Sequence, residues 1–165
     1  MKNILTKMSE ETLDEILNSS FRLYQKKKGY RFSLDSLLLA NFVSLKNTKS
    51  VIELGCGNGV VTLILARHFS NVNFTCVEIQ EDLADLAKKN VHINSLENNV
   101  AILKADASKI NNYLPPQSSD AIYFNPPYRK LNSGRINPNS EKAIARHEIK
   151  GSLIIFLKAA QYLLK

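Results

Sequence analysis

The sequence predicts an α/β fold with a doubly wound, mostly parallel sheet. From residue 50 onward, short apolar runs of strand length alternate with longer segments of helical periodicity, and a glycine-rich turn at 55–59 follows the first strand. Strands that alternate with helices form βαβ units, whose helices cover both faces of a parallel sheet. The length of 165 residues suits one domain. We divide it into an N-terminal segment, 1–45, and a core, 46–165.

The N-terminal segment is expected to be helical and to flank the substrate. Residues 9–18 predict a short helix, because Ser9 can cap it and apolar side chains recur at helical spacing. Residues 21–30 predict a strand or one arm of a hairpin. A second helix is predicted to begin near Ser33. Its inward-facing side chains are expected to be Leu34, Leu37, Leu38 and Phe42.

The core contains four predicted strands, at 51–54, 74–79, 100–103 and 121–124. Helices are predicted at 60–69, 82–91 and 153–164, and the last repeats apolar residues at 153, 157, 160 and 164. Residues 110–119 predict a loop broken by Pro115 and Pro116. A doubly wound sheet usually has more than four strands. We therefore expect C-terminal strands to be missing from this chain.

Composition excludes several classes of protein. No apolar run approaches the roughly 18 residues of a membrane span, and the charged N-terminus is unlike a signal peptide. Cys56 and Cys76 lie in or beside apolar strands, which predicts small buried thiols in a reducing, cytoplasmic compartment. His68 and His92 lie far from any cluster of metal ligands, so we expect no metal site.

The glycine-rich turn, Glu53 to Gly59, predicts a ligand site. Glycines permit positive φ and let a ligand approach the backbone, and the next helix offers unpaired N–H groups. The third glycine comes one residue earlier than in the dinucleotide fingerprint, which leaves S-adenosylmethionine as the other main ligand class. Glu78 and Asp106 close the next two strands and are placed to bind ribose hydroxyls and an adenine amino group. Alternatively, these acids are helix caps or solvated loop residues.

The segment Asn125-Pro126-Pro127-Tyr128 follows the fourth strand and is the most specific motif. An amine conjugated to a ring or a carbonyl is a poor nucleophile, because its lone pair is delocalised. The side-chain oxygen of Asn125 and the carbonyl of Pro126 could accept its two hydrogens. Pro127 makes the segment rigid, and Tyr128 can stack on a planar target. The alternative is a proline turn that contains an asparagine by chance.

Together these motifs resemble the class I, Rossmann-like, S-adenosylmethionine-dependent amino-methyltransferases. Residues 25–40, QKKKGYRFSLDSLLLA, and residues 145–148, ARHE, are similar to the tRNA adenine-N6 methyltransferases that modify a valine tRNA. The resemblance implies S-adenosyl-L-methionine as cofactor and Asn125 and Tyr128 at the adenine. Arg31, Phe32 and Asp35 would help to close over the cofactor. The other cofactor residues would be Glu53, Gly55, Cys56, Gly57, Glu78, Ile79, Asp106, Ala107 and Asn125.

The net charge of +7 is unevenly distributed. Basic side chains gather in 22–31 and in 129–150, and we expect both segments to hold the RNA backbone beside the target base. Two solvated surfaces are the alternative. His147 is assigned a structural or positioning part rather than that of a base. The expected substrate-binding residues are Lys26, Lys27, Lys28, Arg129, Lys130, Arg135, Arg146, His147 and Glu148.

Other functions share parts of this pattern. Glutamine-N5 methylation of release factors needs the same two acceptors, since an amide nitrogen is equally delocalised. Methylation of ribosomal RNA or DNA bases, and an inactive cofactor-binding module, also remain open. A nicotinamide-dependent dehydrogenase is disfavoured by the glycine spacing. The sequence leaves open whether the chain is a monomer or a homodimer.

Overall fold

The computed structural model describes residues 10–16, 21–29, 31–126 and 153–165. Four parallel strands form one sheet in the order β5–β4–β3–β6. Their bounds are Ser50–Leu54 for β3, Asn73–Glu78 for β4, Val100–Lys104 for β5 and Ala121–Phe124 for β6. The predicted α/β fold is confirmed.

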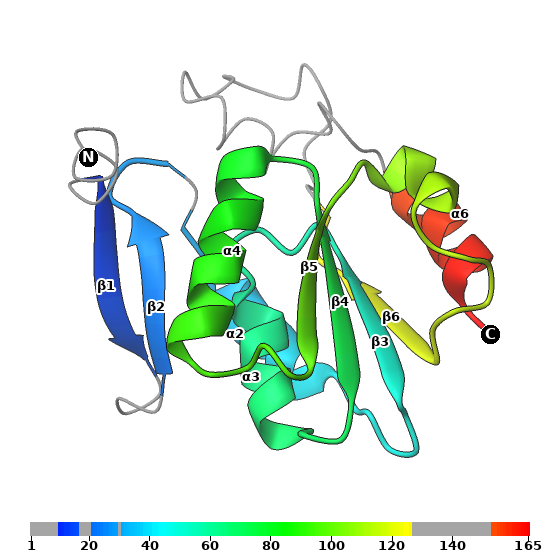
Figure 1. Cartoon of the computed structure of the whole chain (residues 1–165), viewed down its shortest axis with the longest axis horizontal. Coiled ribbons are helices and arrows are strands. Elements are labelled where there is room, and N and C mark those ends of the chain that lie inside the picture. Colours follow the sequence, from blue (N-terminus) through cyan, green and yellow to red (C-terminus); the bar gives the residue numbers. More distant parts are fainter. Residues whose placement is uncertain (1–9, 17–20, 30, 127–152) are drawn as a thin grey trace.

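Helices cover both faces of this sheet (Figure 1). On one side lie α2 (Leu34–Phe42), α3 (Val60–His68) and α4 (Glu81–Ile93), and on the other lie α6 (Leu153–Leu163) and the short 3-10 helix η1 (Ala107–Asn112). Chain order reverses between β3 and β6, because β4 and β5 extend the sheet one way from β3 and β6 extends it the other way. In open α/β sheets such a reversal is where ligands bind.

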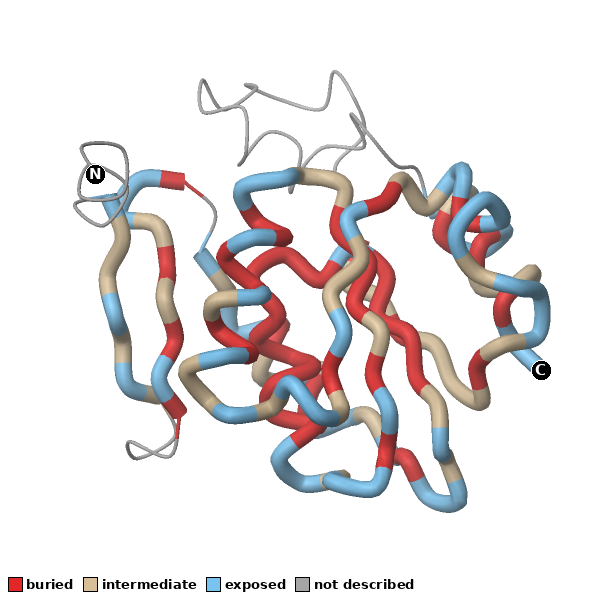
Figure 2. The backbone as a smooth tube through the Cα atoms, in the orientation of Figure 1, coloured by how far each residue is buried: buried red, intermediate tan, exposed pale blue. Residues whose placement is uncertain are grey.

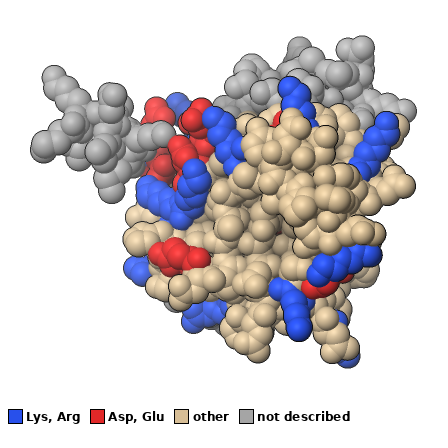
Figure 3. Space-filling view, turned by 45° about the vertical axis from the view of Figure 1, so that its right-hand side comes forward, with Lys and Arg blue, Asp and Glu red and all other residues tan. Residues whose placement is uncertain are grey.

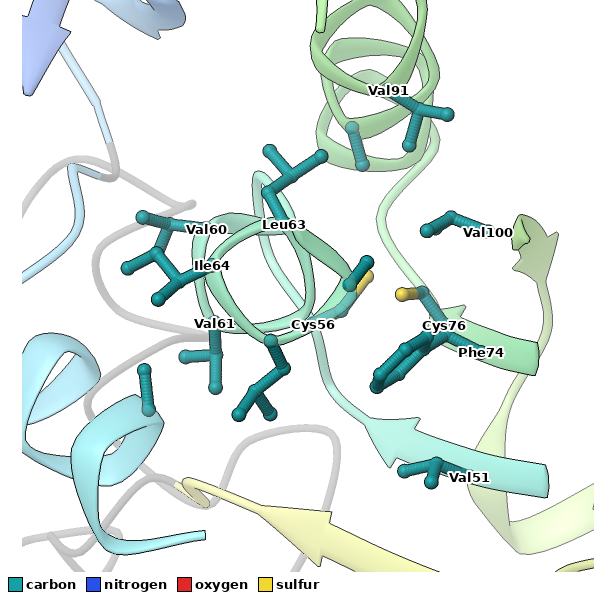
Figure 4. Close-up of a cluster of buried hydrophobic side chains, with 14 of the residues drawn as sticks. Val51, Cys56, Val60, Val61, Leu63, Ile64, Phe74, Cys76, Val91 and Val100 are labelled. Carbon is teal, nitrogen blue, oxygen red and sulfur yellow. The ribbon is translucent and has the colours of Figure 1, made fainter. Parts of the chain in front are cut away.

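One apolar cluster lies on each face of the sheet. Buried residues are concentrated in α3 and in the inner strands (Figure 2). Alternate residues of β3 point to opposite faces, as in any strand. Val51 belongs to the larger cluster, in which it lies below Phe74 and which also contains side chains of α3 (Figure 4). Leu54 belongs to the second cluster with Phe156 of α6. The apolar runs of the core strands thus reflect burial on both faces.

The N-terminal segment corrects one prediction. A helix was expected over residues 9–18, but the described part of this range contains β1 (Glu11–Ile16), a strand paired antiparallel with β2 (Phe21–Lys26). In β2, Phe21, Leu23 and Gln25 are buried at alternate positions. This strand gives the backbone of β1 a hydrogen-bonding partner, and that tertiary pairing outweighs the local helical spacing. The strand or hairpin arm predicted within residues 21–30 is confirmed over Phe21–Lys26.

The α2 helix begins after Ser33 as predicted but packs through another face. Three of the four side chains expected to face inward are exposed: Leu34, Leu38 and Phe42. Leu37 is half-buried. Ser36 and Ala40, one turn apart, are buried instead, and α2 lies against α3. Small side chains let two helices approach closely, and Leu37 and Leu39 pack beside them against the larger cluster.

The α6 helix is apolar around most of its surface, and its buried side chains are Phe156, Ala159 and Leu163. The repeat at 153, 157, 160 and 164 is therefore not its packing face. Leu153 and Leu157 are exposed, and the surface on this side of the molecule is largely uncharged (Figure 3). No helix among the described residues is long and apolar enough to cross a membrane.

Between β5 and β6, η1 occupies 107–112, where the predicted loop was expected to begin at residue 110. Asp106 caps η1 by accepting a hydrogen bond from the backbone N–H of Ser108 at 2.8 Å. This bond explains why a helical turn forms despite the absence of apolar periodicity. Cys56 and Cys76 are buried free thiols, as predicted.

Replacing a buried leucine of α6 should cost far more stability than replacing an exposed one. We expect Leu163→Ala, at a position 0% exposed, to lower the free energy of unfolding by about 2–4 kcal/mol. Leu157→Ala, at a position 52% exposed, should lower it by less than about 1 kcal/mol. Urea denaturation measures both, and equal losses would contradict the observed orientation of α6.

Candidate functional site

The sheet register brings the predicted site positions to one edge. Leu54, the last residue of β3, pairs with Val77 of β4 on one side and with Phe124 of β6 on the other. The next residues along these strands are Gly55, Glu78 and Asn125. Because the strands are parallel, all three positions lie at the carboxyl edge of the sheet, with Gly55 and Asn125 flanking the reversal of strand order.

The glycine turn has the backbone conformation that its composition predicts. Gly55, Gly57 and Gly59 have φ of 74°, 59° and 83°, in the left-handed region that favours glycine. The N–H of Gly55 donates to the carbonyl of Val77 at 2.8 Å, which fixes the turn to β4. A Cβ on Gly55 would lie 3.2 Å from the ring of Phe156, so position 55 is also constrained by packing.

Glu78 lies inside the turn rather than on an open surface. Its carboxylate accepts hydrogen bonds from the backbone N–H of Gly57 and of Gln80, both at 2.8 Å. The side chain is 5% exposed. Gln80 is the N-cap residue of α4, so the helix-cap interpretation of this acid holds in part. A carboxylate can accept about four hydrogen bonds, and Glu78 therefore suits both the turn and a ligand hydroxyl.

Asn58, between Gly57 and Gly59, carries a buried polar side chain. It is 1% exposed, and within the described part of the chain neither its amide nitrogen nor its amide oxygen has a hydrogen-bond partner. A buried polar group left unpaired costs about 1–3 kcal/mol, which a ligand with a donor and an acceptor would recover. This orphaned amide fits a turn that binds a polar ligand.

Glu53 lies on the α3 side of β3, beneath the turn. Its carboxylate accepts a hydrogen bond from the Thr62 hydroxyl at 2.5 Å, and Thr62 also bonds Tyr123 at 2.6 Å. The Cys76 thiol donates to Thr62 at 3.1 Å. Burial raises the pKa of Glu53 to about 7, while the hydrogen bonds from Thr62 oppose the shift. This network stabilises the turn from below.

Cys56 is buried in the turn, and its sulfur lies toward that of Cys76 in Figure 4. A hydrogen bond with Cys76 and burial raise the pKa of the Cys56 thiol well above its usual value. A thiol that resists ionisation is a poor nucleophile. Its side chain therefore contributes packing.

Asp106 and Ala107 follow β5 and lie at the same carboxyl edge of the sheet. Ala105 N–H donates to the carbonyl of Glu78 at 3.0 Å, which continues the β5–β4 pairing into the loop. Asp106 is half-buried and caps η1, so its alternative interpretation as a cap also holds. Ile79 is half-buried beside these residues.

Asn125 and Pro126 are half-buried and buried at the end of β6. The remaining motif residues, Pro127 and Tyr128, lie outside the described residues. So do six of the expected substrate contacts: Arg129, Lys130, Arg135, Arg146, His147 and Glu148.

The basic residues that precede α2 mostly have partners. Arg31, expected to help close over the cofactor, instead forms an ion pair with Asp14 at 2.5 Å and donates to the Thr12 hydroxyl at 3.1 Å, so it holds the hairpin. Lys26 pairs with Asp82 at 3.1 Å. Lys27 and Lys28 are exposed. Phe32 is half-buried, and Asp35 accepts from the Ser33 hydroxyl at 3.4 Å.

Sequence reasoning missed several residues that build the site. Thr62 and Tyr123 were assigned only to a helix and a strand, and Asn58 and Phe156 were given no role. A buried threonine in an apolar helix is the one signal that could have pointed to the network, because its hydroxyl needs a partner.

Comparisons with known proteins agree with this geometry. The family described as "Methyltransferase small domain" matches residues 31–161. The chain is 31% identical over 119 residues to a protein of Aliivibrio salmonicida named tRNA1(Val) (adenine(37)-N6)-methyltransferase, covering 72% of this chain and 49% of the relative. A relative of the same name from Pedobacter heparinus is 32% identical over 127 residues, covering 77% and 52%. The chain spans about half the length of these curated relatives.

Among solved structures, Pyrococcus horikoshii TYW2 in complex with MeSAdo is similar, with a TM-score of 0.61 and 14% identity. The similarity covers 94% of this chain and 49% of that chain. At this identity it supports the fold alone.

Replacing Glu53 with glutamine should make stability less dependent on pH. The raised pKa means that folded Glu53 keeps a proton between about pH 4.5 and 7, where the unfolded chain has lost it. Its stabilising contribution is complete below that interval and is lost as the pH rises through it, a change on the order of 3 kcal/mol.

Urea unfolding at several pH values across this interval provides the test. The wild-type free energy of unfolding should fall more steeply with pH than that of Glu53→Gln, whose amide oxygen can still accept from Thr62. Parallel pH profiles would show that Glu53 does not titrate as a buried acid.

Proposed function

Since the chain belongs to the methyltransferase small domain family, we propose that it transfers a methyl group from S-adenosyl-L-methionine to an exocyclic amino nitrogen, adenine N6 in tRNA. One observation carries the proposal. The pairing of Leu54 with Phe124 puts Asn125 directly beside the glycine turn. The two motifs are 70 residues apart in sequence, and a methyl transfer needs donor and acceptor in contact.

The residues of the turn suit the cofactor. The backbone at Gly55 and Gly57 would approach it, Glu78 would accept hydrogen bonds from its ribose, and Asp106 would lie at its adenine. Asn58 offers a buried donor and acceptor. S-adenosyl-L-methionine supplies a methyl group already activated on a sulfonium. The protein's contribution is therefore mainly to hold the reacting groups in place.

Asn125 and Pro126 would orient the acceptor nitrogen. The side-chain oxygen of Asn125 and the carbonyl of Pro126 accept its two hydrogens, which favours the pyramidal nitrogen that can attack the methyl carbon. The methylated nitrogen becomes cationic and loses its proton readily, so no strong base is needed at this site.

Adenine in tRNA is the substrate that several observations favour together. The similar proteins of Aliivibrio salmonicida and Pedobacter heparinus carry names that specify adenine 37 of a valine tRNA. The net charge of +7 favours a polyanion. Lys27 and Lys28 are exposed next to the hairpin. Radiolabelled methyl transfer to unmodified tRNA, compared with purified release factor, tests the substrate: transfer to the protein alone would refute the RNA assignment.

Asn125→Ala should lower methyl transfer about a hundredfold or more, equivalent to about 3 kcal/mol of barrier, because one acceptor for the target amine is lost. Single-turnover transfer to tRNA measures the rate. Asn98→Ala is the matched control, since Asn98 is an exposed asparagine in the loop before β5, at the opposite edge of the sheet. Full activity in Asn125→Ala would refute the assignment of the site.

Glu78→Ala should weaken cofactor binding by something like 1–3 kcal/mol, because a charged acceptor is removed from both the turn and the ribose. Calorimetry with S-adenosylhomocysteine measures the dissociation constant. Glu97→Ala is a suitable control, since Glu97 forms an exposed ion pair with His92. An affinity equal to that of the wild type would count against this role of Glu78.

A further inference from the structure

Asn90 of α4 joins two parts of the molecule that are distant in sequence. Its side-chain oxygen accepts from the backbone N–H of Tyr24 at 2.7 Å. Its side-chain nitrogen donates to the carbonyl of Tyr24 at 3.1 Å and to the carbonyl of Asn58 at 3.0 Å. The side chain is 0% exposed and uses both of its N–H groups. One buried amide therefore holds the N-terminal hairpin and the glycine turn at once.

Asn94, one helical turn further along, makes a similar pair of bonds to the hairpin only. It accepts from the N–H of Arg22 at 3.2 Å and donates to the carbonyl of Arg22 at 2.7 Å. Its third bond returns to the carbonyl of Asn90 within α4. The two asparagines thus bond alternate residues of β2, as a neighbouring strand would. Only Asn90 reaches the glycine turn.

The backbone around Asn58 is held from two sides. Glu78 accepts from the N–H of Gly57 at 2.8 Å, and Asn90 donates to the carbonyl of Asn58. The glycines on either side of Asn58 have few steric restraints on their dihedral angles. Without Asn90, the carbonyl of Asn58 would lose this partner. The turn would keep the bonds from the Gly57 N–H to Glu78 and from the Gly59 N–H to the carbonyl of Cys56 at 2.9 Å, and a ligand would have to order more of the turn as it binds.

We propose that Asn90 is a positioning residue that orders the glycine turn for the cofactor and couples it to the N-terminal hairpin. The inference rests on the proposed function for the identity of the ligand. Because Asn90 bonds both partners, an ordered hairpin favours the ordered turn, and ligand binding at the turn stabilises the hairpin in return.

Hydrogen exchange in the wild-type protein tests this coupling with an internal control. The N–H groups of Tyr24 and Arg22 are bonded by equivalent asparagines, but only the bond to Tyr24 leads to the turn. S-adenosylhomocysteine should slow exchange at Tyr24 at least about threefold more than at Arg22. Equal slowing at both amides, or none at Tyr24, would overturn the proposal.

Variants separate positioning from stability. Asn90→Ala and the isosteric Asn90→Asp, which lacks the N–H donors, should each weaken S-adenosylhomocysteine binding about tenfold or more by calorimetry. Asn94→Ala removes equivalent hairpin bonds and should weaken it less than about twofold. All three affinities are compared at a temperature where denaturation curves show each variant folded. Equal weakening by Asn90→Ala and Asn94→Ala would reduce Asn90 to a structural role and overturn the proposal.

A measurement without ligand keeps this inference distinct from the proposed function. In amide NMR spectra of the free protein, the signals of Gly57 and Gly59 should shift in Asn90→Asp and stay in place in Asn94→Ala. Unmoved signals in Asn90→Asp would overturn the inference. If the wild-type chain failed to bind S-adenosylhomocysteine while these signals shifted, the proposed cofactor would be refuted and the ordering of the turn by Asn90 would stand.

Discussion

The candidate site depends on the parallel register of β3 with its two neighbours. Leu54 pairs with both Val77 and Phe124, and the residue after each of these positions belongs to a motif. A shift of β6 by one residue would turn its alternating side chains to the other face and move Asn125 away from the turn. Phe124 of β6 packs against Phe156 on one face and Tyr123 lies in the larger apolar cluster on the other, which makes such a shift costly. Apolar packing on both faces of the sheet is thus what sets the geometry of the polar edge.

A second constraint is the polar network under the glycine turn. Glu53 is buried in a position where an apolar side chain would pack with less penalty, and its raised pKa reflects that cost. Thr62 and Tyr123 offset part of it through hydrogen bonds that connect β3, α3 and β6. These bonds tie together the same elements whose ends form the site. The network therefore contributes specificity of arrangement, because a displaced β6 would leave the buried Tyr123 hydroxyl without its partners Thr62 and Glu53.

The sequence predicted the elements of the core well and the packing faces poorly. Strands and helices from residue 50 onward follow from apolar runs and from the glycine turn, whose positive φ values only glycine adopts readily. The prediction of an N-terminal helix was wrong because β1 forms a strand by pairing with β2. In turn β2 is bonded to Asn90 and Asn94, which lie 66 and 72 residues further along the chain. In α2 and α6, apolar residues occur on most sides, so periodicity could not reveal that Ala40 and Leu163 pack while Leu38 and Leu157 do not. In each of these three elements, contacts with residues distant in sequence determined the structure.

The N-terminal hairpin shows why such partners matter for function. The family match begins at residue 31, so β1 and β2 precede it. Nevertheless the hairpin lies against α4 (Figure 1), where Lys89 contacts the Tyr24 ring and pairs with Glu11. The helix that follows Glu78 in sequence is thus also the support of the hairpin. Any change in how the hairpin packs on α4 therefore acts on a helix whose N-cap residue, Gln80, is bonded to Glu78. A segment outside the family match is in this way connected to the centre of the site through one helix, and local sequence patterns do not encode that connection.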